Sequence, residues 1–140
     1  MDSLDEKSID NLLKCAREIR EAAYAPYSGF RVGAALLSHD GHIFKGCNVE
    51  NVSYGATNCA ERTAVFSAVA NGCHDFVAIA ISAGDETVFP CGICRQVLAE
   101  FSPNLTVICG KKGGYELFCL SELLPHGFNN FSTEEKKLNV

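Results

Sequence analysis

The 140-residue sequence lacks an excess of basic residues and a long apolar run. Its 17 acidic residues outnumber 12 Lys and Arg residues, which gives a net charge of −5, whereas binding a polyanion would require a clustered basic surface. No stretch approaches the roughly 18 apolar residues of a membrane-spanning helix. The acidic residues 1–14 have no continuous apolar core and do not resemble a signal peptide. We therefore expect a cytoplasmic protein that binds neither a nucleic acid polymer nor a membrane.

The sequence also has no linker, internal repeat or low-complexity tract, and residues 1–140 are predicted to be a single domain. With 47% hydrophobic and 21% charged residues, a chain of this length can bury a substantial core. Residues 132–140 are polar, and we expect them to be a frayed tail.

Apolar periodicity predicts the order of the secondary structure elements. The N-terminal part, about residues 1–26, is predicted to be a helix over residues 3–24 that Ser3 and Glu6 start as a capping box and Pro26 ends. The first two of the following strands should be an antiparallel hairpin, and the later alternation of helix and strand predicts an α/β layered domain around a five-stranded mixed sheet. Strands are predicted at residues 30–37, 42–47, 76–81, 105–109 and 115–120, helices at residues 59–70 and 91–101, and a short helix or turn from residue 121 to residue 125.

Eight cysteines are the unusual feature of the composition. In a reducing compartment, cysteines are more often buried thiols or metal ligands than disulfides. Cys91 and Cys94 stand at the predicted start of one helix and Cys59 at the start of another, so three thiols can point at one site. Three protein ligands with an open fourth position are typical of a catalytic zinc site. The sequence leaves Cys47 open as a further ligand.

Two charged residues follow Cys59 closely. If Cys59 caps its helix, Glu61 in the first turn can reach a metal-bound water without ligating the metal. Three thiolates on Zn²⁺ leave a net charge of about −1, which works against deprotonation of that water. The N-termini of the two helices and Arg62 are placed to offset this charge. Without the cysteines, Glu61 would be interpreted as helix-dipole compensation and Arg62 as a solvated helix residue.

Two segments of the sequence contain the three cysteines and Glu61: Cys-Ala-Glu-Arg-Thr-Ala at residues 59–64 and Pro-Cys-Gly-Ile-Cys-Arg-Gln-Val at residues 90–97. Both resemble the small, tetrameric type of cytidine deaminase. The similarity covers nearly the whole chain, from residues 27–35 to residues 122–125. It implies a three-layer α/β/α domain around the five-stranded mixed sheet, and a homotetramer.

The resemblance implies one Zn²⁺ per subunit, bound by Cys59, Cys91 and Cys94. The implied reaction is the hydrolytic deamination of cytidine and 2′-deoxycytidine to uridine and 2′-deoxyuridine plus ammonia, in pyrimidine salvage. Zinc-bound hydroxide would attack C4 of the base, and Glu61 would shuttle the protons.

The substrate-binding residues are expected in a loop and at three separate positions. Asn48 and Glu50 have period-two spacing, so both can point to a ribose hydroxyl, and in the family these positions hold the 3′-hydroxyl. The resemblance makes Phe30 a stacking partner of the pyrimidine, places the backbone of Ala60 at the base, and matches Phe128 to an aromatic residue of a neighbouring subunit's site. From the residues alone, loop-stabilising contacts for Asn48 and Glu50, and a core position for Phe30, stay open.

Four other functions stay open at this point. A related deaminase would act on another aminopyrimidine with the same zinc and Glu61. A thiol-disulfide protein would use Cys91 and Cys94 without a metal, and a structural zinc module would add a fourth protein ligand. Polynucleotide editing is disfavoured by the acidic balance and by the absence of a basic, aromatic-lined groove.

Overall fold

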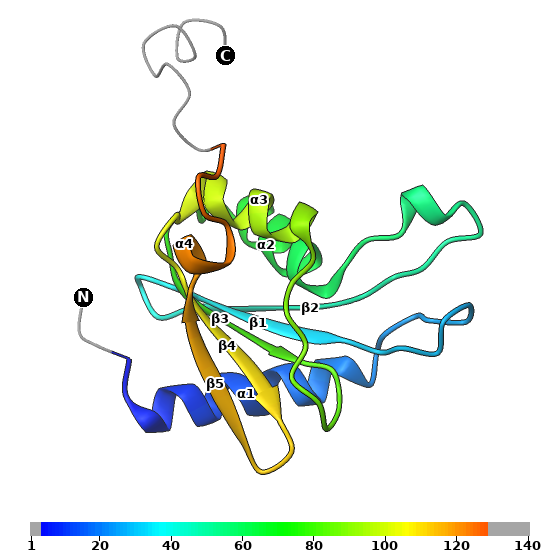
Figure 1. Cartoon of the computed structure of the whole chain (residues 1–140), viewed down its shortest axis with the longest axis horizontal. Coiled ribbons are helices and arrows are strands. Elements are labelled where there is room, and N and C mark those ends of the chain that lie inside the picture. The colour runs from blue at the N-terminus through cyan, green and yellow to red at the C-terminus, as the bar shows by residue number, and fades with distance from the viewer. Residues whose placement is uncertain (1–3, 129–140) are drawn as a thin grey trace, which may run out of the picture.

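One mixed sheet of five strands runs through the computed structural model, which describes residues 4–128 (Figure 1). The strands are β1 (Gly33–Ser38), β2 (Ile43–Cys47), β3 (Phe76–Ser82), β4 (Thr106–Lys111) and β5 (Gly114–Cys119). They lie in the order β2-β1-β3-β4-β5, with β3 and β4 parallel and the other neighbours antiparallel. The predicted five-stranded mixed sheet is therefore confirmed. The tail predicted at residues 132–140 lies outside the described residues.

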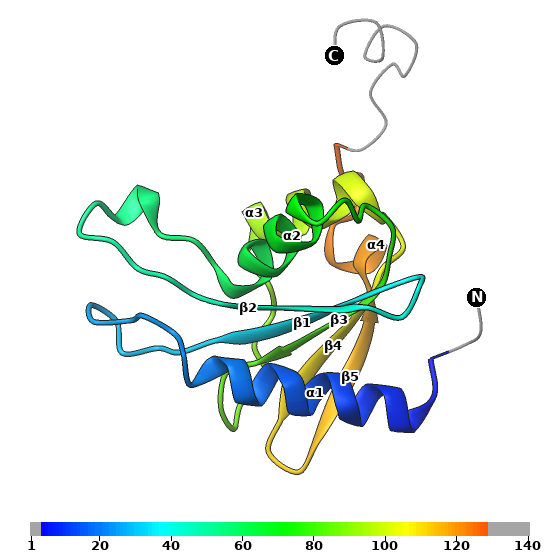
Figure 2. The same ribbon diagram turned by 180° about the vertical axis from the view of Figure 1, so that it is seen from behind.

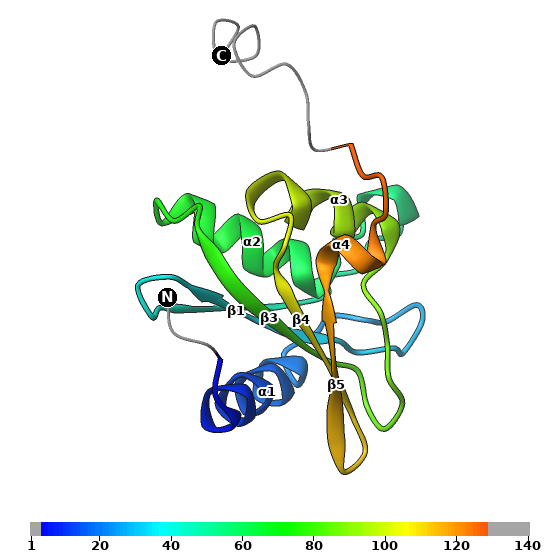
Figure 3. The ribbon, with the colours of Figure 1, turned by 60° about the vertical axis from the view of Figure 1, so that its left-hand side comes forward.

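Helices cover both faces of the sheet (Figure 2, Figure 3). The helices are α1 (Glu6–Arg20) on one face and, on the other, α2 (Ala60–Ala70), α3 (Gly92–Phe101) and α4 (Leu120–Leu123), with a short 3₁₀ turn η1 (Tyr54–Ala56) in the loop after β2. Successive side chains of a strand point to opposite faces, so Ala35 of β1 packs in the cluster with α1, and Ala34 and Leu36 pack in the cluster with α2 and α3. The three-layer α/β/α prediction is confirmed.

None of the helices within residues 4–128 is long and apolar enough to cross a membrane.

The predicted start of the N-terminal helix is wrong. The N-cap is Asp5, whose carboxylate accepts a hydrogen bond from the backbone N–H of Ser8 at 2.8 Å. Helix α1 therefore starts at Glu6, three residues later than predicted, because the Asp5 side chain satisfies one of the free N–H groups of its first turn. Ser3, the other member of the predicted capping box, lies outside the described residues.

The predicted end of this helix is also wrong, because α1 ends at Arg20 rather than continuing to residue 24. The backbone of Tyr24 pairs with the loop after β2 instead: its N–H donates to Asn48 at 3.0 Å, and its carbonyl accepts from Glu50 at 2.8 Å. Because the backbone of Tyr24 is paired with this loop, the helix ends before Pro26.

Strand β1 begins at Gly33, three residues after the predicted start at Phe30. The side chain of Asn48 takes the place of a strand partner there. Its Oδ1 accepts from the N–H of Val32 at 2.9 Å, and its Nδ2 donates to the carbonyl of Phe30 at 2.8 Å. The segment before β1 is therefore held by the side chain of Asn48 and by one backbone hydrogen bond, from the N–H of Asn48 to the carbonyl of Val32 at 3.3 Å, rather than by a regular ladder.

Strand β2 touches the first turns of α2 backbone to backbone at Gly46. A Cβ atom on this residue would lie 2.4 Å from the backbone nitrogen of Ala64 and 2.5 Å from the carbonyl oxygen of Ala60. Only glycine allows this approach. This close contact positions the start of α2, and therefore the candidate site, against β2.

Candidate active site

Three cysteines meet where α2 and α3 begin. Cys59 is the N-cap of α2 and Cys91 the N-cap of α3, and Cys94 lies in the first turn of α3. The predicted position of Cys59, just outside helical geometry, is confirmed. Neither N-cap side chain makes a capping hydrogen bond to the backbone of its helix, so both sulfur atoms are available to a common centre.

The spacing of the three sulfur atoms fits a zinc ion. The Sγ atoms of Cys59 and Cys91 are 3.8 Å apart, those of Cys91 and Cys94 are 3.5 Å apart, and all three lie within 4.8 Å of one another. Tetrahedral zinc with Zn–S bonds of about 2.3 Å would separate two sulfur ligands by about 3.8 Å. Residues 4–128 add no fourth ligand atom to this cluster, and Cys47 is not part of it. This arrangement fits an open catalytic site rather than a closed structural one.

One positively charged side chain contacts the thiols. Arg62 donates from Nη2 to Sγ of Cys59 at 3.2 Å, and its buried Nε has no hydrogen-bond partner. A hydrogen bond from Cys94, together with Arg62, lowers the pKa of Cys59 to about 5, although burial acts against this. The hydrogen bond to Cys59 and burial raise the pKa of Cys94. The site therefore holds one thiolate readily at neutral pH, and metal binding would release the remaining protons.

Glu61 lies beside the cysteines in the first turn of α2 and is only 5% exposed. Burial raises its pKa to about 7, and the negative charge of Cys59 adds to the increase. Among the described residues, no side chain donates a hydrogen bond to the Glu61 carboxylate. A buried carboxyl with a pKa near neutrality can both accept and release a proton, which is what general acid–base catalysis requires.

The side chains of Asn48 and Glu50 are both engaged in holding the chain around Phe30. As described above, Asn48 is hydrogen bonded to the backbone of Phe30 and Val32. The carboxylate of Glu50 accepts hydrogen bonds from the N–H groups of Tyr27 at 2.9 Å and Ser28 at 3.1 Å, and from the Ser28 hydroxyl. These hydrogen bonds lower the pKa of Glu50, and the bond from the Ser28 side chain has the largest effect. Each side chain keeps hydrogen-bonding capacity for a ligand, because a carboxylate has about four acceptor sites and an amide has two of each kind.

Ser28 is a residue of this region that the sequence reasoning did not single out. Its hydroxyl donates to Glu50 and accepts from the N–H of Phe30 at 2.9 Å, so it connects the predicted stacking residue to the predicted sugar-binding residue. The signal was its place in the Tyr-Ser-Gly stretch directly before Phe30. A cavity of about 400 Å³ opens at this loop, lined by Tyr27, Ser28, Glu50, Asn51, Tyr54 and Thr57.

The other three predicted substrate-binding residues differ in exposure. Phe30 is 47% exposed, so it is not an ordinary core residue. Ala60 is fully buried directly after Cys59. Phe128 is 71% exposed, and its backbone carbonyl accepts a hydrogen bond from Gln96 of α3. The structure thus presents two aromatic rings at the surface and a small residue beside the thiols.

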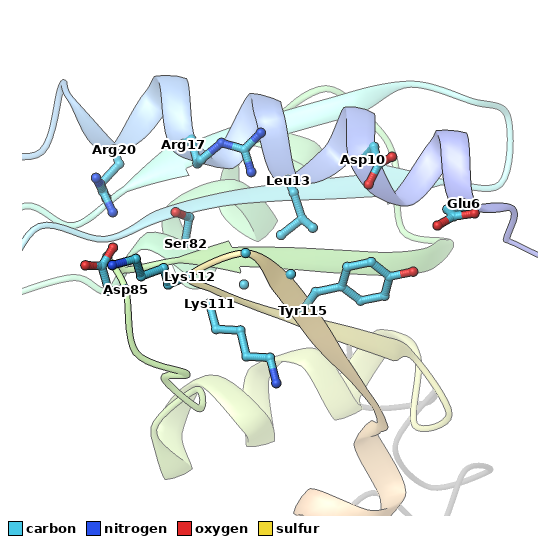
Figure 4. A pocket seen from close by; sticks show the side chains of 14 residues that line it. Glu6, Asp10, Leu13, Arg17, Arg20, Ser82, Asp85, Lys111, Lys112 and Tyr115 are labelled. Atoms are coloured by element: carbon cyan, nitrogen blue, oxygen red, sulfur yellow. The ribbon is translucent and has the colours of Figure 1, made fainter.

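Another cavity, of about 580 Å³, lies between α1 and the β4–β5 hairpin (Figure 4). Arg17 and Arg20 line it together with Asp85, and Glu6 and Asp10 line its other end, so charges of both signs are present. It is on the α1 face of the sheet, whereas the cysteines begin the helices of the opposite face. This cavity does not belong to the thiol site.

The fold and the site together define a zinc-binding hydrolytic deaminase: a three-layer α/β/α domain in which two helix starts carry three thiols beside a buried glutamate. Comparison with known proteins specifies the family. Residues 6–110 match the model of the cytidine and deoxycytidylate deaminase zinc-binding region. The chain belongs to this family.

Individual relatives are similar over most of the chain. A cytidine deaminase of Halalkalibacterium halodurans is 53% identical over 120 residues, which are 84% of this chain and 91% of that protein. One of Sporosarcina psychrophila is 48% identical over 124 residues, covering 86% and 91%. The crystal structure of cytidine deaminase from Burkholderia pseudomallei superposes with a TM-score of 0.82 at 48% identity, covering 85% of this chain and 98% of that one.

Proposed function

We propose that this protein catalyses the zinc-dependent hydrolytic deamination of cytidine and 2′-deoxycytidine to uridine and 2′-deoxyuridine, with release of ammonia, in pyrimidine salvage. The observation that carries the proposal is the buried carboxyl of Glu61 beside three thiols with the spacing of zinc ligands. Similarity to cytidine deaminases over more than four fifths of the chain supports the substrate class.

In this reaction Cys59, Cys91 and Cys94 hold the zinc ion, which would supply the Lewis acid that makes water nucleophilic near neutral pH. Glu61 accepts a proton from the attacking water, delivers one to ring N3 so that C4 becomes electrophilic, and then protonates the departing amine. Its pKa of about 7 suits both directions of transfer. Arg62 keeps the thiolate of Cys59 stable through its hydrogen bond.

The remaining predicted residues orient the nucleoside. Phe30 stacks on the pyrimidine ring and the backbone of Ala60 lies at the base, while Asn48 and Glu50 bind the sugar 3′-hydroxyl. The exposure of the Phe30 ring and the spare hydrogen-bonding capacity of the two polar residues support these roles. The charge on Glu50 would repel a 5′-phosphate, which favours free nucleosides over nucleotides. Phe128 completes the site of a neighbouring subunit in a homotetramer.

The test is the loss of cytidine absorbance in the presence of the purified zinc-loaded protein and its Glu61→Gln variant. We expect the variant to keep its zinc and its fold but to lose about 10²- to 10⁴-fold in kcat, the range typical of a lost general acid–base group. Glu18→Gln, on the exposed side of α1, is the matched control and should behave as the wild type. Unchanged turnover in Glu61→Gln would remove Glu61 from the mechanism. A zinc-loaded wild type that acts on neither nucleoside would redirect the search to other aminopyrimidines.

A further inference from the structure

Besides the two cysteines at its start, helix α3 carries a residue that contacts the C-terminal part of the described chain. Gln96, two residues after Cys94, donates a hydrogen bond from its side-chain Nε2 to the backbone carbonyl oxygen of Phe128 at 2.7 Å. The donor is a side chain in the second turn of α3, and the acceptor lies 32 residues away, beyond α4. The backbone of Phe128 is therefore attached to the same helix that begins at the thiol cluster.

Arg95, the neighbour of Gln96, connects the same two parts of the molecule. Its Nε donates to the carbonyl of Pro90 at 2.7 Å, directly before Cys91, and its Nη1 donates to the carbonyl of Leu123 at 2.6 Å, at the end of α4. One half-buried guanidinium group thus links the turn that carries a zinc ligand to the segment that leads to Phe128. Both hydrogen bonds are to backbone carbonyls, so they fix the course of the chain rather than a mobile side chain.

The chain between α4 and Phe128 is bent back towards α3. His126 has a φ of 56°, a left-handed conformation that non-glycine residues rarely adopt. The next residue, Gly127, is so close to Leu124 that a Cβ would lie 2.8 Å from its side chain. Such a conformation persists where surrounding contacts hold it, and the hydrogen bonds from Arg95 and Gln96 are contacts of this kind. The result is an anchored backbone with a ring that is 71% exposed at Phe128.

We infer that Gln96 is a positioning residue for Phe128: through the Phe128 carbonyl it orients a ring that binds substrate in the site of a neighbouring subunit. Arg95 supports the same segment from the zinc-binding turn. This inference rests on the proposed function, because it assumes a nucleoside substrate and a site shared between subunits. It adds that the helix carrying the cysteines of one site also sets the geometry of the next one.

The first test is a double-mutant cycle between Gln96 and Phe128, measured on zinc-loaded protein with cytidine as substrate. Gln96→Ala should raise KM roughly 3- to 10-fold, the range expected for one lost hydrogen bond, with kcat, zinc content and thermal midpoint nearly unchanged. Gln96→Glu, which keeps the shape but cannot donate to the carbonyl, should do the same. In a Phe128→Ala background, Gln96→Ala should have no further effect on KM. Additive effects on KM, or an unchanged KM in both Gln96 variants, would overturn the inference.

The second test asks in which subunit the effect appears. Gln96→Ala subunits have intact zinc and Glu61, whereas Glu61→Gln subunits are inactive but hold Phe128 in place. In tetramers that contain both chains, purified by two different tags, the active sites should recover a KM close to the wild-type value. A KM that stays at the value of Gln96→Ala would show that Gln96 acts within its own subunit, and would overturn the shared-site part of the inference.

The failure of this inference differs from the failure of the proposed function. If wild-type protein with a full zinc complement does not deaminate cytidine or deoxycytidine, the proposed function is wrong. If the wild type is active and the Gln96 variants have its KM, only the positioning role is wrong.

Discussion

Glu61 and Asn48 are both polar residues that lie almost completely inside the molecule, and different interactions keep them there. Both ends of the Asn48 amide are hydrogen bonded to the backbone before β1, so its burial is compensated locally. No side chain of residues 4–128 donates a hydrogen bond to the carboxyl of Glu61, and burial raises its pKa to about 7. A buried carboxyl with a raised pKa beside a cluster of possible metal ligands is typical of a functional site, whereas a buried amide with both ends hydrogen bonded to nearby backbone is typical of a structural role.

At the residue scale, the zinc site can be tested through Cys91. Cys91→Ala leaves two thiols, and we expect it to lose both bound zinc and deaminase activity, because a zinc ion with only two protein ligands is weakly held. Metal analysis of the purified variant is the measurement, with circular dichroism to confirm that it folds. Cys73→Ala, which removes a half-buried cysteine outside the cluster, is the control and should retain zinc. Full zinc occupancy in Cys91→Ala would contradict the ligand assignment.

The sequence predicts the residues of the zinc cluster better than it predicts those of the sugar-binding loop. Cys59 and Cys91 are caps of adjacent helices, and cap positions can be read from local sequence patterns. The contacts of Asn48 with Phe30 and Val32 join residues 18 and 16 positions apart, and depend on how two loops come together in space. No local pattern indicates them, nor the hydrogen bond between Gln96 and Phe128.

At the scale of elements, the predicted types are correct and the errors are at boundaries. Helix α2 ends at Ala70 with Asn71 as its C-cap, as the Asn-Gly pair predicts, and Gly72 has the positive φ of 80° that glycine allows. Helix α1 ends four residues before its predicted end because the backbone of Tyr24 pairs with a distant loop. Tertiary pairing of this kind overrides local propensity, and it cannot be read from the residues of the helix alone.

The contact of β2 with α2 predicts the effect of Gly46→Ala. The added methyl group meets backbone atoms of Ala60 and Ala64, which cannot turn aside as a side chain would. We expect a loss of about 1–3 kcal/mol in the free energy of unfolding, and weaker zinc binding because the start of α2 moves. Urea denaturation and a zinc titration measure the two effects. Gly55→Ala, at a glycine whose Cβ would meet open space, should change neither, and an unaltered stability in Gly46→Ala would contradict the close contact.

At the scale of the whole molecule, the exposed apolar side chains are unevenly distributed. None of the large hydrophobic residues exposed within residues 4–128 belongs to α1. Those of the opposite layer and its loops include Phe66 of α2, Ile93 of α3, Phe89 and Phe128. Apolar groups gathered on one side of a domain are typical of an interface. This distribution supports assembly through the layer that carries the candidate site.

If the proposed homotetramer assembles through this layer, its activity should depend on assembly. Size-exclusion chromatography with light scattering should give about four times the 15.1 kDa mass of the chain. Dilution to the point of dissociation should reduce the specific activity, because each site would lose the ring that a neighbour supplies. Ile93→Asp, at an exposed residue of this layer, should weaken assembly and reduce activity with it. Glu18→Gln on α1 is the control and should change neither. A stable monomer with full activity would contradict the shared site.

The position of the three thiols also makes the metal a cross-link. Cys59 and Cys91 are 32 positions apart, and the chain between them contains all of α2 and β3, so one ion closes a long loop by joining two helix starts. The entropic cost of closing a loop grows only slowly with its length, so the length of this loop matters little. The spacing of Cys91 and Cys94 is different, because both must stay within a single turn at the start of α3. Insertions in the loop between β3 and Pro90 are therefore compatible with this clamp, but an insertion between the two cysteines of α3 is not.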